Sequence, residues 1–129
     1  MGYFCEVRCP DCGYSRKFQL GCGKKDFDRE AVYSHFDMMD GWAAKVEEMK
    51  KSSAYLTFRY RLGRCEDCGM LKEVPEITFE DGTVFYSKQC TCDPDSEHEI
   101  RLVADEDGET VPCPDCGNML TPERTGLWD

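Results

Sequence analysis

Ten cysteines dominate the chemistry of this 129-residue sequence, and eight of them fall into four close pairs. Three pairs follow the pattern Cys-x-Asp-Cys-Gly, whereas a single residue separates the cysteines of the remaining pair. A Cys-x-x-Cys turn directs two sulfur atoms at one point, and two such turns supply the four thiolates of a tetrahedral metal site. Eight cysteines therefore suffice for two ions. Numbered along the chain, the pairs are Cys9 and Cys12, Cys65 and Cys68, Cys90 and Cys92, and Cys113 and Cys116.

The spacing favours metal binding over a framework of disulfides, although a small chain rich in cysteine could hold either. The sequence opens without a basic segment followed by an apolar run, so we expect no signal peptide. No segment reaches the roughly 18 apolar residues of a membrane span. We therefore expect a cytoplasmic protein with reduced thiols and no membrane association.

The spacing alone leaves open which pairs share an ion. We favour a scheme in which the second and third pairs form one site, because a short loop closes at a lower entropic cost than a long one. The first and fourth pairs then form the other site and bring the two ends of the chain together. A second scheme joins the second pair to the fourth and the first to the third, and a third scheme adds Cys5 and Cys22 to the first pair. In the first two schemes Cys5 and Cys22 are expected to be structural thiols.

Alternating apolar and polar residues predict short strands beside most pairs, over residues 3–8, 14–20, 54–62, 77–80, 83–86 and 99–104. Apolar residues from Val32 to Val46 recur at helical spacing, which predicts a helix from about residue 29 to residue 51. Residues 121–129 are expected to be a tail that Trp128 fastens.

The predicted fold class is α+β. We expect a small metal-stapled protein of zinc ribbons or rubredoxin-like knuckles, made of short antiparallel hairpins with one helical insert. Its regions are an N-terminal knuckle hairpin over residues 1–27, the insert over residues 28–52 and a zinc-ribbon region over residues 53–129. We expect the zinc-ribbon region to form one compact domain with the N-terminal hairpin.

The formal net charge of −10 is concentrated in the second half, because residues 70–129 carry fifteen acidic and four basic side chains. Such a chain repels phosphate backbones, which argues against general nucleic-acid binding. One local exception is a candidate nucleic-acid contact, in which Arg59, Arg61 and Arg64 lie close in sequence to Phe58 and Tyr60.

The pattern Cys-Pro-Asp-Cys-Gly at residues 9–13 and 113–117 resembles the iron knuckles of rubredoxin, and it is equally similar to zinc ribbons of uncharacterised bacterial proteins. The order of motifs along nearly the whole chain resembles those bacterial proteins, which implies metal binding and carries no known activity. The sequence departs from the pattern at Cys90-Thr91-Cys92, where a one-residue gap replaces the usual two.

Sites made of four thiolates leave no open coordination position, unlike those of catalytic zinc, so we do not expect an enzyme. We expect a structural protein that binds two zinc ions and acts as a protein-interaction or adaptor module. The alternatives are a nucleic-acid-associated zinc ribbon and a rubredoxin-like electron carrier that holds iron.

Overall fold

The computed structural model describes residues 2–22, 44, 47–48, 56–79, 82–88, 90, 92–93 and 99–128. Within these ranges the regular structure is nearly all antiparallel strand, with one short 3-10 helix, η2 (Asp105–Asp107). The strands are β1 (Gly2–Arg8), β2 (Ser15–Gly21), β3 (Leu56–Cys65), β4 (Leu71–Phe79), β5 (Val84–Tyr86), β6 (Ile100–Leu102), β7 (Val111–Pro112), β8 (Met119–Leu120) and β9 (Glu123–Trp128). None of the helical residues in these ranges belongs to a helix long and apolar enough to cross a membrane.

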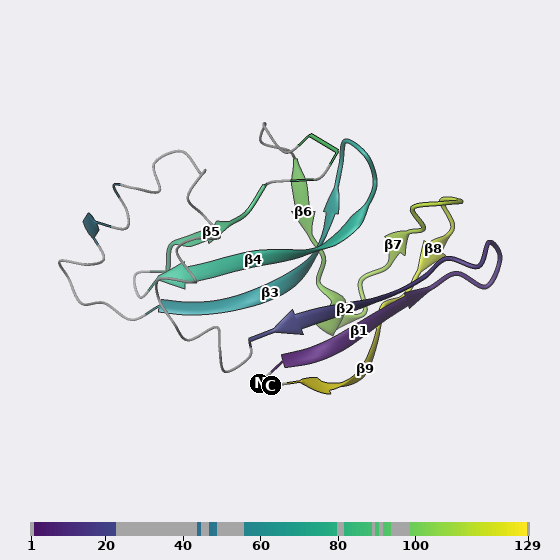
Figure 1. Ribbon diagram of the computed structural model, residues 1–129, viewed down its shortest axis with the longest axis horizontal. Coiled ribbons are helices and arrows are strands. Elements are labelled where there is room, and N and C mark those ends of the chain that lie inside the picture. The colour runs from purple at the N-terminus through teal and green to yellow at the C-terminus, as the bar shows by residue number, and fades with distance from the viewer. Residues whose placement is uncertain are drawn as a thin grey trace.

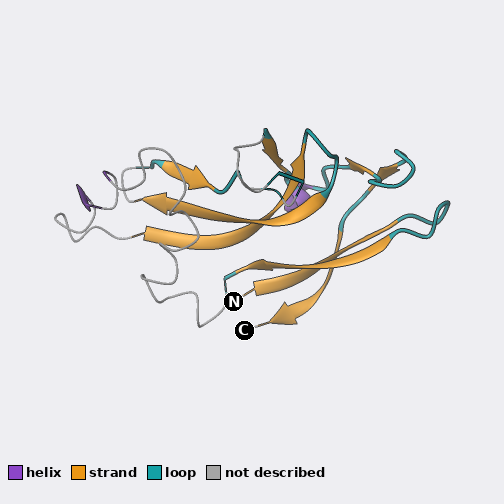
Figure 2. Cartoon of the chain, turned by 45° about the horizontal axis from the view of Figure 1, so that its top comes forward, coloured by secondary structure: helices purple, strands orange, loops and turns teal. Residues whose placement is uncertain are grey.

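Seven of these strands form one sheet in the order β5-β4-β3-β2-β1-β9, with β6 paired to β3, while β7 and β8 form a separate hairpin (Figure 1). The hairpins β1–β2 and β3–β4 pair along most of their length, but β2 and β3 are in register only at Gly21 and Tyr60 within the described residues. The sheet therefore consists of two halves that meet along a narrow seam. Figure 2 shows the β3–β4 hairpin lying over the layer formed by β1, β2 and β9.

The main core lies between these two halves and draws side chains from both. In each long hairpin the alternation of side chains places one face toward the other half, which buries apolar positions and leaves polar ones outside. The buried members are Cys5, Val7, Cys9, Phe18, Leu20, Leu62, Leu71, Val103, Val111, Cys113 and Leu120. Two of them, Cys9 and Cys113, belong to cysteine pairs, so the main core and the first and fourth pairs share the same part of the molecule.

The predicted α+β class is wrong, because the described residues form mainly antiparallel sheet and contain no helix of seven or more residues. The β1–β2 and β3–β4 hairpins do not stand as separate short ribbons but join into one sheet with longer strands, and only β7–β8 forms a separate ribbon within the described residues. β4 begins at Leu71, six residues before the predicted strand, and its first half pairs with β3 despite Pro75. Pairing with a neighbouring strand outweighs the weak local propensity of such a segment. The predicted helical insert lies outside the described residues except for Ala44, Glu47 and Glu48.

The C-terminal segment is a strand rather than a tail, and Trp128 fastens it as expected. β9 pairs antiparallel with β1, and Trp128 lies opposite Gly2 in this register. Its indole N–H donates to the carbonyl oxygens of Leu20 (2.7 Å) and Tyr3 (3.1 Å). The ring occupies the space where a Cβ on Gly2 would stand, so only glycine allows this close approach. Trp128 therefore connects β9 to both β1 and β2.

We expect Trp128→Ala to lower the free energy of unfolding by about 3 kcal/mol, because it removes a large packed ring together with its hydrogen bonds. Trp128→Phe keeps an aromatic ring and should lose about 1 kcal/mol. Leu127→Ala is the matched control in the same strand, since Leu127 is 66% exposed, and it should lose less than about 0.5 kcal/mol. Urea denaturation followed by circular dichroism measures all three, and equal losses for Trp128→Ala and Leu127→Ala would contradict the fastening role.

Candidate metal centres

The first and fourth cysteine pairs come together in a cluster that we call site A. Cys9 and Cys12 lie in the turn between β1 and β2, and Cys113 and Cys116 lie in the turn between β7 and β8. Figure 1 shows both turns at the same end of the molecule. The Sγ atoms of Cys9 and Cys116 are 3.5 Å apart, as are those of Cys12 and Cys113. All four sulfur atoms lie within 4.8 Å of one another, although the pairs are about a hundred residues apart in sequence.

The second and third pairs form an equivalent cluster, site B. Cys65 and Cys68 lie in the turn between β3 and β4, and Cys90 and Cys92 follow β5. The Sγ atoms of Cys65 and Cys92 are 3.9 Å apart, and those of Cys68 and Cys90 are 3.6 Å apart. These four sulfur atoms also lie within 4.8 Å of one another. The grouping follows the favoured pairing scheme, and the other two schemes are wrong.

Three of the four pairs sit in turns with the same backbone hydrogen bonds. In each, the N–H of the first cysteine donates to the carbonyl oxygen five residues later, at Tyr14 (2.7 Å), Met70 (3.0 Å) or Asn118 (2.7 Å). The glycine after the second cysteine donates its N–H to the first cysteine's carbonyl oxygen, over 3.1, 2.7 and 2.9 Å in chain order. These glycines have φ values of +84°, +77° and +82°, a conformation that other residues rarely adopt. The backbone of such a turn therefore directs both cysteine sulfur atoms toward the same point.

Each cysteine pair contributes one buried and one exposed residue. The buried members are Cys9, Cys65, Cys90 and Cys113, and the exposed members are Cys12, Cys68, Cys92 and Cys116. In site A the buried cysteines belong to the main core, whereas in site B they pack with Val74 and Ile100 in a smaller cluster. Each site therefore has two cysteines that pack against the interior and two that lie at the surface.

The sulfur separations fit a tetrahedral metal site. A Zn–S distance of about 2.3 Å in a tetrahedron places the sulfur atoms about 3.8 Å apart, close to the 3.5–3.9 Å observed. A disulfide requires about 2.05 Å, and none of the ten cysteines forms one. Four thiolates in this geometry suit zinc or iron.

Local hydrogen bonds prepare one thiol in each site for metal binding, which requires the thiolate form. The backbone N–H of Cys12 is the main cause that lowers the pKa of Cys9 to about 7. Burial raises the pKa of Cys90, but the N–H of Cys92 and the neighbouring sulfur atoms outweigh burial and lower it to about 7. Both groups reach their charged form near neutral pH.

The two cysteines outside the pairs take different positions. Cys5 is 1% exposed on the core face of β1, and burial raises the pKa of its thiol to about 12. It is therefore a structural thiol, as expected. Cys22 follows β2 and is half-buried.

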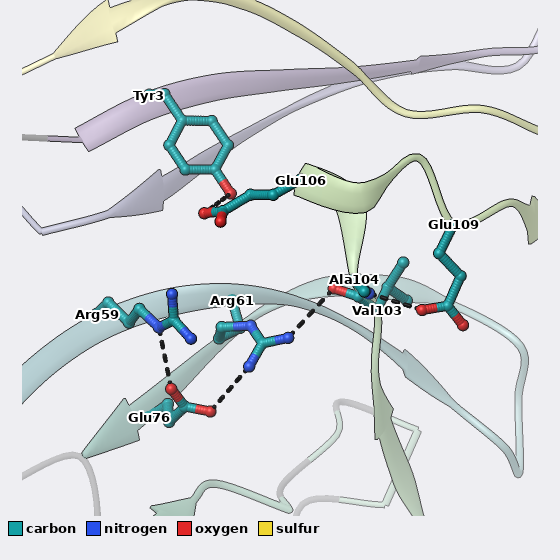
Figure 3. Close-up of polar contacts among 8 residues, drawn as sticks. All are labelled: Tyr3, Arg59, Arg61, Glu76, Val103, Ala104, Glu106 and Glu109. Carbon is teal, nitrogen blue, oxygen red and sulfur yellow. Dashed lines mark hydrogen bonds and ion pairs between the residues drawn. The ribbon is translucent and has the colours of Figure 1, made fainter. Parts of the chain in front are cut away.

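The structure pairs all three arginines of the predicted nucleic-acid patch with carboxylates. Arg59 lies opposite Glu76 in the β3–β4 register, and its Nε donates to Glu76 Oε1 over 3.0 Å (Figure 3). Arg61 Nη1 donates to the other oxygen of Glu76 over 3.1 Å, and Arg64 donates to Glu66 over 2.9 Å. Glu76 is 5% exposed, so its charge is held beside the two guanidinium groups. These carboxylates offset part of the positive charge that a phosphate backbone would need, and nucleic-acid binding by this patch stays a prediction.

Glu76 was not identified from the sequence as the partner of Arg59 and Arg61, although the register of the hairpin predicts this pairing. The knuckle at the second pair fixes the register of the hairpin around it, because Cys65 N–H bonds to Met70. Counting outward from that turn brings Arg59 opposite Glu76. Opposite charges at directly facing positions are the pairs that stabilise antiparallel strands.

A second polar contact connects the two layers near this point. The Tyr3 hydroxyl of β1 donates to Asp105 over 2.7 Å, and the guanidinium of Arg124 lies 4.1 Å above the Tyr3 ring. Arg61 also donates to the carbonyl oxygen of Val103 over 3.5 Å (Figure 3). Polar groups from β1, β3, β9 and the segment around η2 therefore converge where the two halves of the sheet meet.

Comparisons of this chain with protein-family models, with curated proteins and with solved structures find no match. The resemblance to zinc ribbons therefore rests on the cysteine turns. What the structure supports is two clusters of four cysteines that are compatible with metal binding.

Proposed function

We propose that this chain is a structural zinc-binding protein that holds one ion in site A and one in site B. The observation that carries the proposal is the convergence of two sets of four sulfur atoms, each set within 4.8 Å. Three turns hold their sulfur atoms in place by backbone hydrogen bonds, which lowers the entropy lost on binding. Zinc is the ion most often found with four thiolates in small domains.

The ions would act on the fold rather than on a substrate. Four thiolates complete a tetrahedral coordination sphere, so no position is left for a water molecule or a reacting group. An ion in site A would fasten the β7–β8 hairpin to the β1–β2 hairpin, and one in site B would fasten the third pair to the β3–β4 hairpin. We propose that the folded protein serves as an interaction module whose acidic surface, with a net charge of −10, selects a protein partner with basic character.

The direct test is elemental analysis of the natively purified protein, combined with its optical spectrum. We expect about two zinc ions per chain and a colourless solution, since eight thiolates provide four for each ion. Cys5→Ala is the control and should keep both ions, because Cys5 lies outside both clusters. A protein without bound metal would overturn the proposal. A red, iron-loaded protein with a reversible one-electron couple would replace it with electron transfer.

The interaction role has a separate test. Fluorescence anisotropy should detect binding of a basic peptide library that weakens as salt is raised, and the metal-stripped protein should not bind. Equal binding by an acidic library would contradict the role assigned to the surface charge.

A further inference from the structure

We propose that the two sites are unequal: site A retains its ion, while site B exchanges its ion with external thiol or chelating ligands. The loss of that ion would release Cys90 and Cys92 from the turn that carries the second pair. This inference rests on the proposed function, because it assumes that both clusters hold a metal. In the exchange the ion passes from four protein thiolates to the acceptor's ligands, and protons from solvent restore the protein thiols without any change of oxidation state.

The first difference between the sites lies in the turn that carries the third pair. The other three pairs occupy the same knuckle, with two backbone hydrogen bonds and a glycine at positive φ. Cys90 and Cys92 are separated by one residue and followed by Asp93 instead of glycine, and the described part of their turn contains a bond from Asp93 N–H to the Cys90 carbonyl oxygen over 3.2 Å. Side chains two residues apart point in the same direction only where the chain is extended or has a suitable turn. The positions of these two sulfur atoms therefore depend more on the bound ion than those of the other pairs do. Site B also contains the longest of the four sulfur contacts, 3.9 Å between Cys65 and Cys92.

The second difference is a hydrogen bond that the third pair cannot repeat. In each knuckle the exposed cysteine's sulfur accepts the N–H of the residue two positions later, which is Tyr14, Met70 or Asn118. The corresponding residue after Cys92 is Pro94, and proline has no backbone N–H. Groups that hydrogen-bond to a metal ligand commonly change metal affinity by about 10- to 100-fold. This pair therefore lacks one contribution that the other three share.

The third difference is how firmly the surrounding chain holds each pair. Both knuckles of site A contribute a cysteine to the main core between the sheet halves. Cys90 belongs to a smaller cluster with Cys65, Val74 and Ile100. The chain before it is held by β5, which pairs with β4 over three residues, and by the bond from Ser87 N–H to the Pro75 carbonyl oxygen over 3.0 Å. Val84 in this strand is 49% exposed. Losing the ion of site B would thus remove the link between the third pair and the turn that joins β3 to β4, whereas β3 and β4 would stay paired.

The test is a titration of the two-zinc protein with a chelator, followed by native mass spectrometry. We expect a one-zinc species to accumulate because site B releases its ion at least about tenfold faster than site A. N-ethylmaleimide added to that species should label the cysteines of the second and third pairs and spare those of the first and fourth. Trypsin should cut after Lys88 in the one-zinc species much faster than in the two-zinc species.

Two variants separate an exchangeable site from a misfolded one. Cys92→Ser should keep one zinc ion and a cooperative thermal transition, while the matched variant Cys116→Ser should lose that transition. Simultaneous loss of both ions, or first labelling at Cys12 and Cys116, would overturn this inference and leave the proposed function standing. A purified protein with no zinc at all would overturn both.

Discussion

Removing both ions with excess chelator is expected to abolish the cooperative thermal transition and most of the β-sheet circular dichroism signal. Structural zinc contributes apparent binding free energies of about 10–16 kcal/mol in zinc-finger peptides at pH 7. A whole domain of this size is typically stable by only about 5–15 kcal/mol. The loss of both ions together therefore exceeds the total stability, and the main core, which has eleven buried side chains among the described residues, is too small to compensate for it.

The measurement is a melting curve followed by circular dichroism before and after chelation. Adding two equivalents of zinc to the stripped protein should restore both the transition and the spectrum, which controls for irreversible damage. Retention of the original melting temperature after proven metal loss would show that apolar packing alone specifies the fold.

A second large effect is expected from Cys113→Ala, with Cys5→Ala as its matched control. Both cysteines are nearly fully buried in the same core, at 3% and 1% exposure, and both substitutions delete one sulfur atom. Cys5→Ala should lower the free energy of unfolding by about 1 kcal/mol, the value of a small amount of buried apolar surface. Cys113→Ala also breaks site A and should cost more than about 5 kcal/mol.

The loop that site A closes strengthens this expectation. Its cysteines are 101–107 residues apart along the chain, compared with 22–27 for site B. The entropic cost of closing a loop in the unfolded chain grows as the logarithm of the loop length. The cross-link at site A should therefore stabilise the folded state by about 1.3 kcal/mol more than the cross-link at site B. Urea denaturation together with zinc content distinguishes the two variants. Equal destabilisation by Cys113→Ala and Cys5→Ala, with unchanged metal content, would remove site A from the proposal.

Much of the local structure was predictable because each knuckle encodes its own geometry. A cysteine pair followed by glycine determines the turn, its backbone hydrogen bonds and the hairpin around it, all within a few residues. The strands beside the first and second pairs followed from that, as did the buried position of Cys5 in β1. Even the pairing of Arg59 with Glu76 was implicit in the register of the hairpin, although the weak strand pattern before Ile77 concealed it.

The sequence by itself determined which cysteines form turns suited to metal and where those turns lie. The short loop between the second and third pairs favoured the correct grouping, but only the tertiary structure decided which turns face each other, because that depends on how the hairpins pack. It also decided that the hairpins join through β2 and β3 into one sheet and that the final segment becomes β9. The polar pattern of residues 123–126 carries no strand signal; pairing with β1 and the anchoring of Trp128 supply the stabilisation that local propensity lacks.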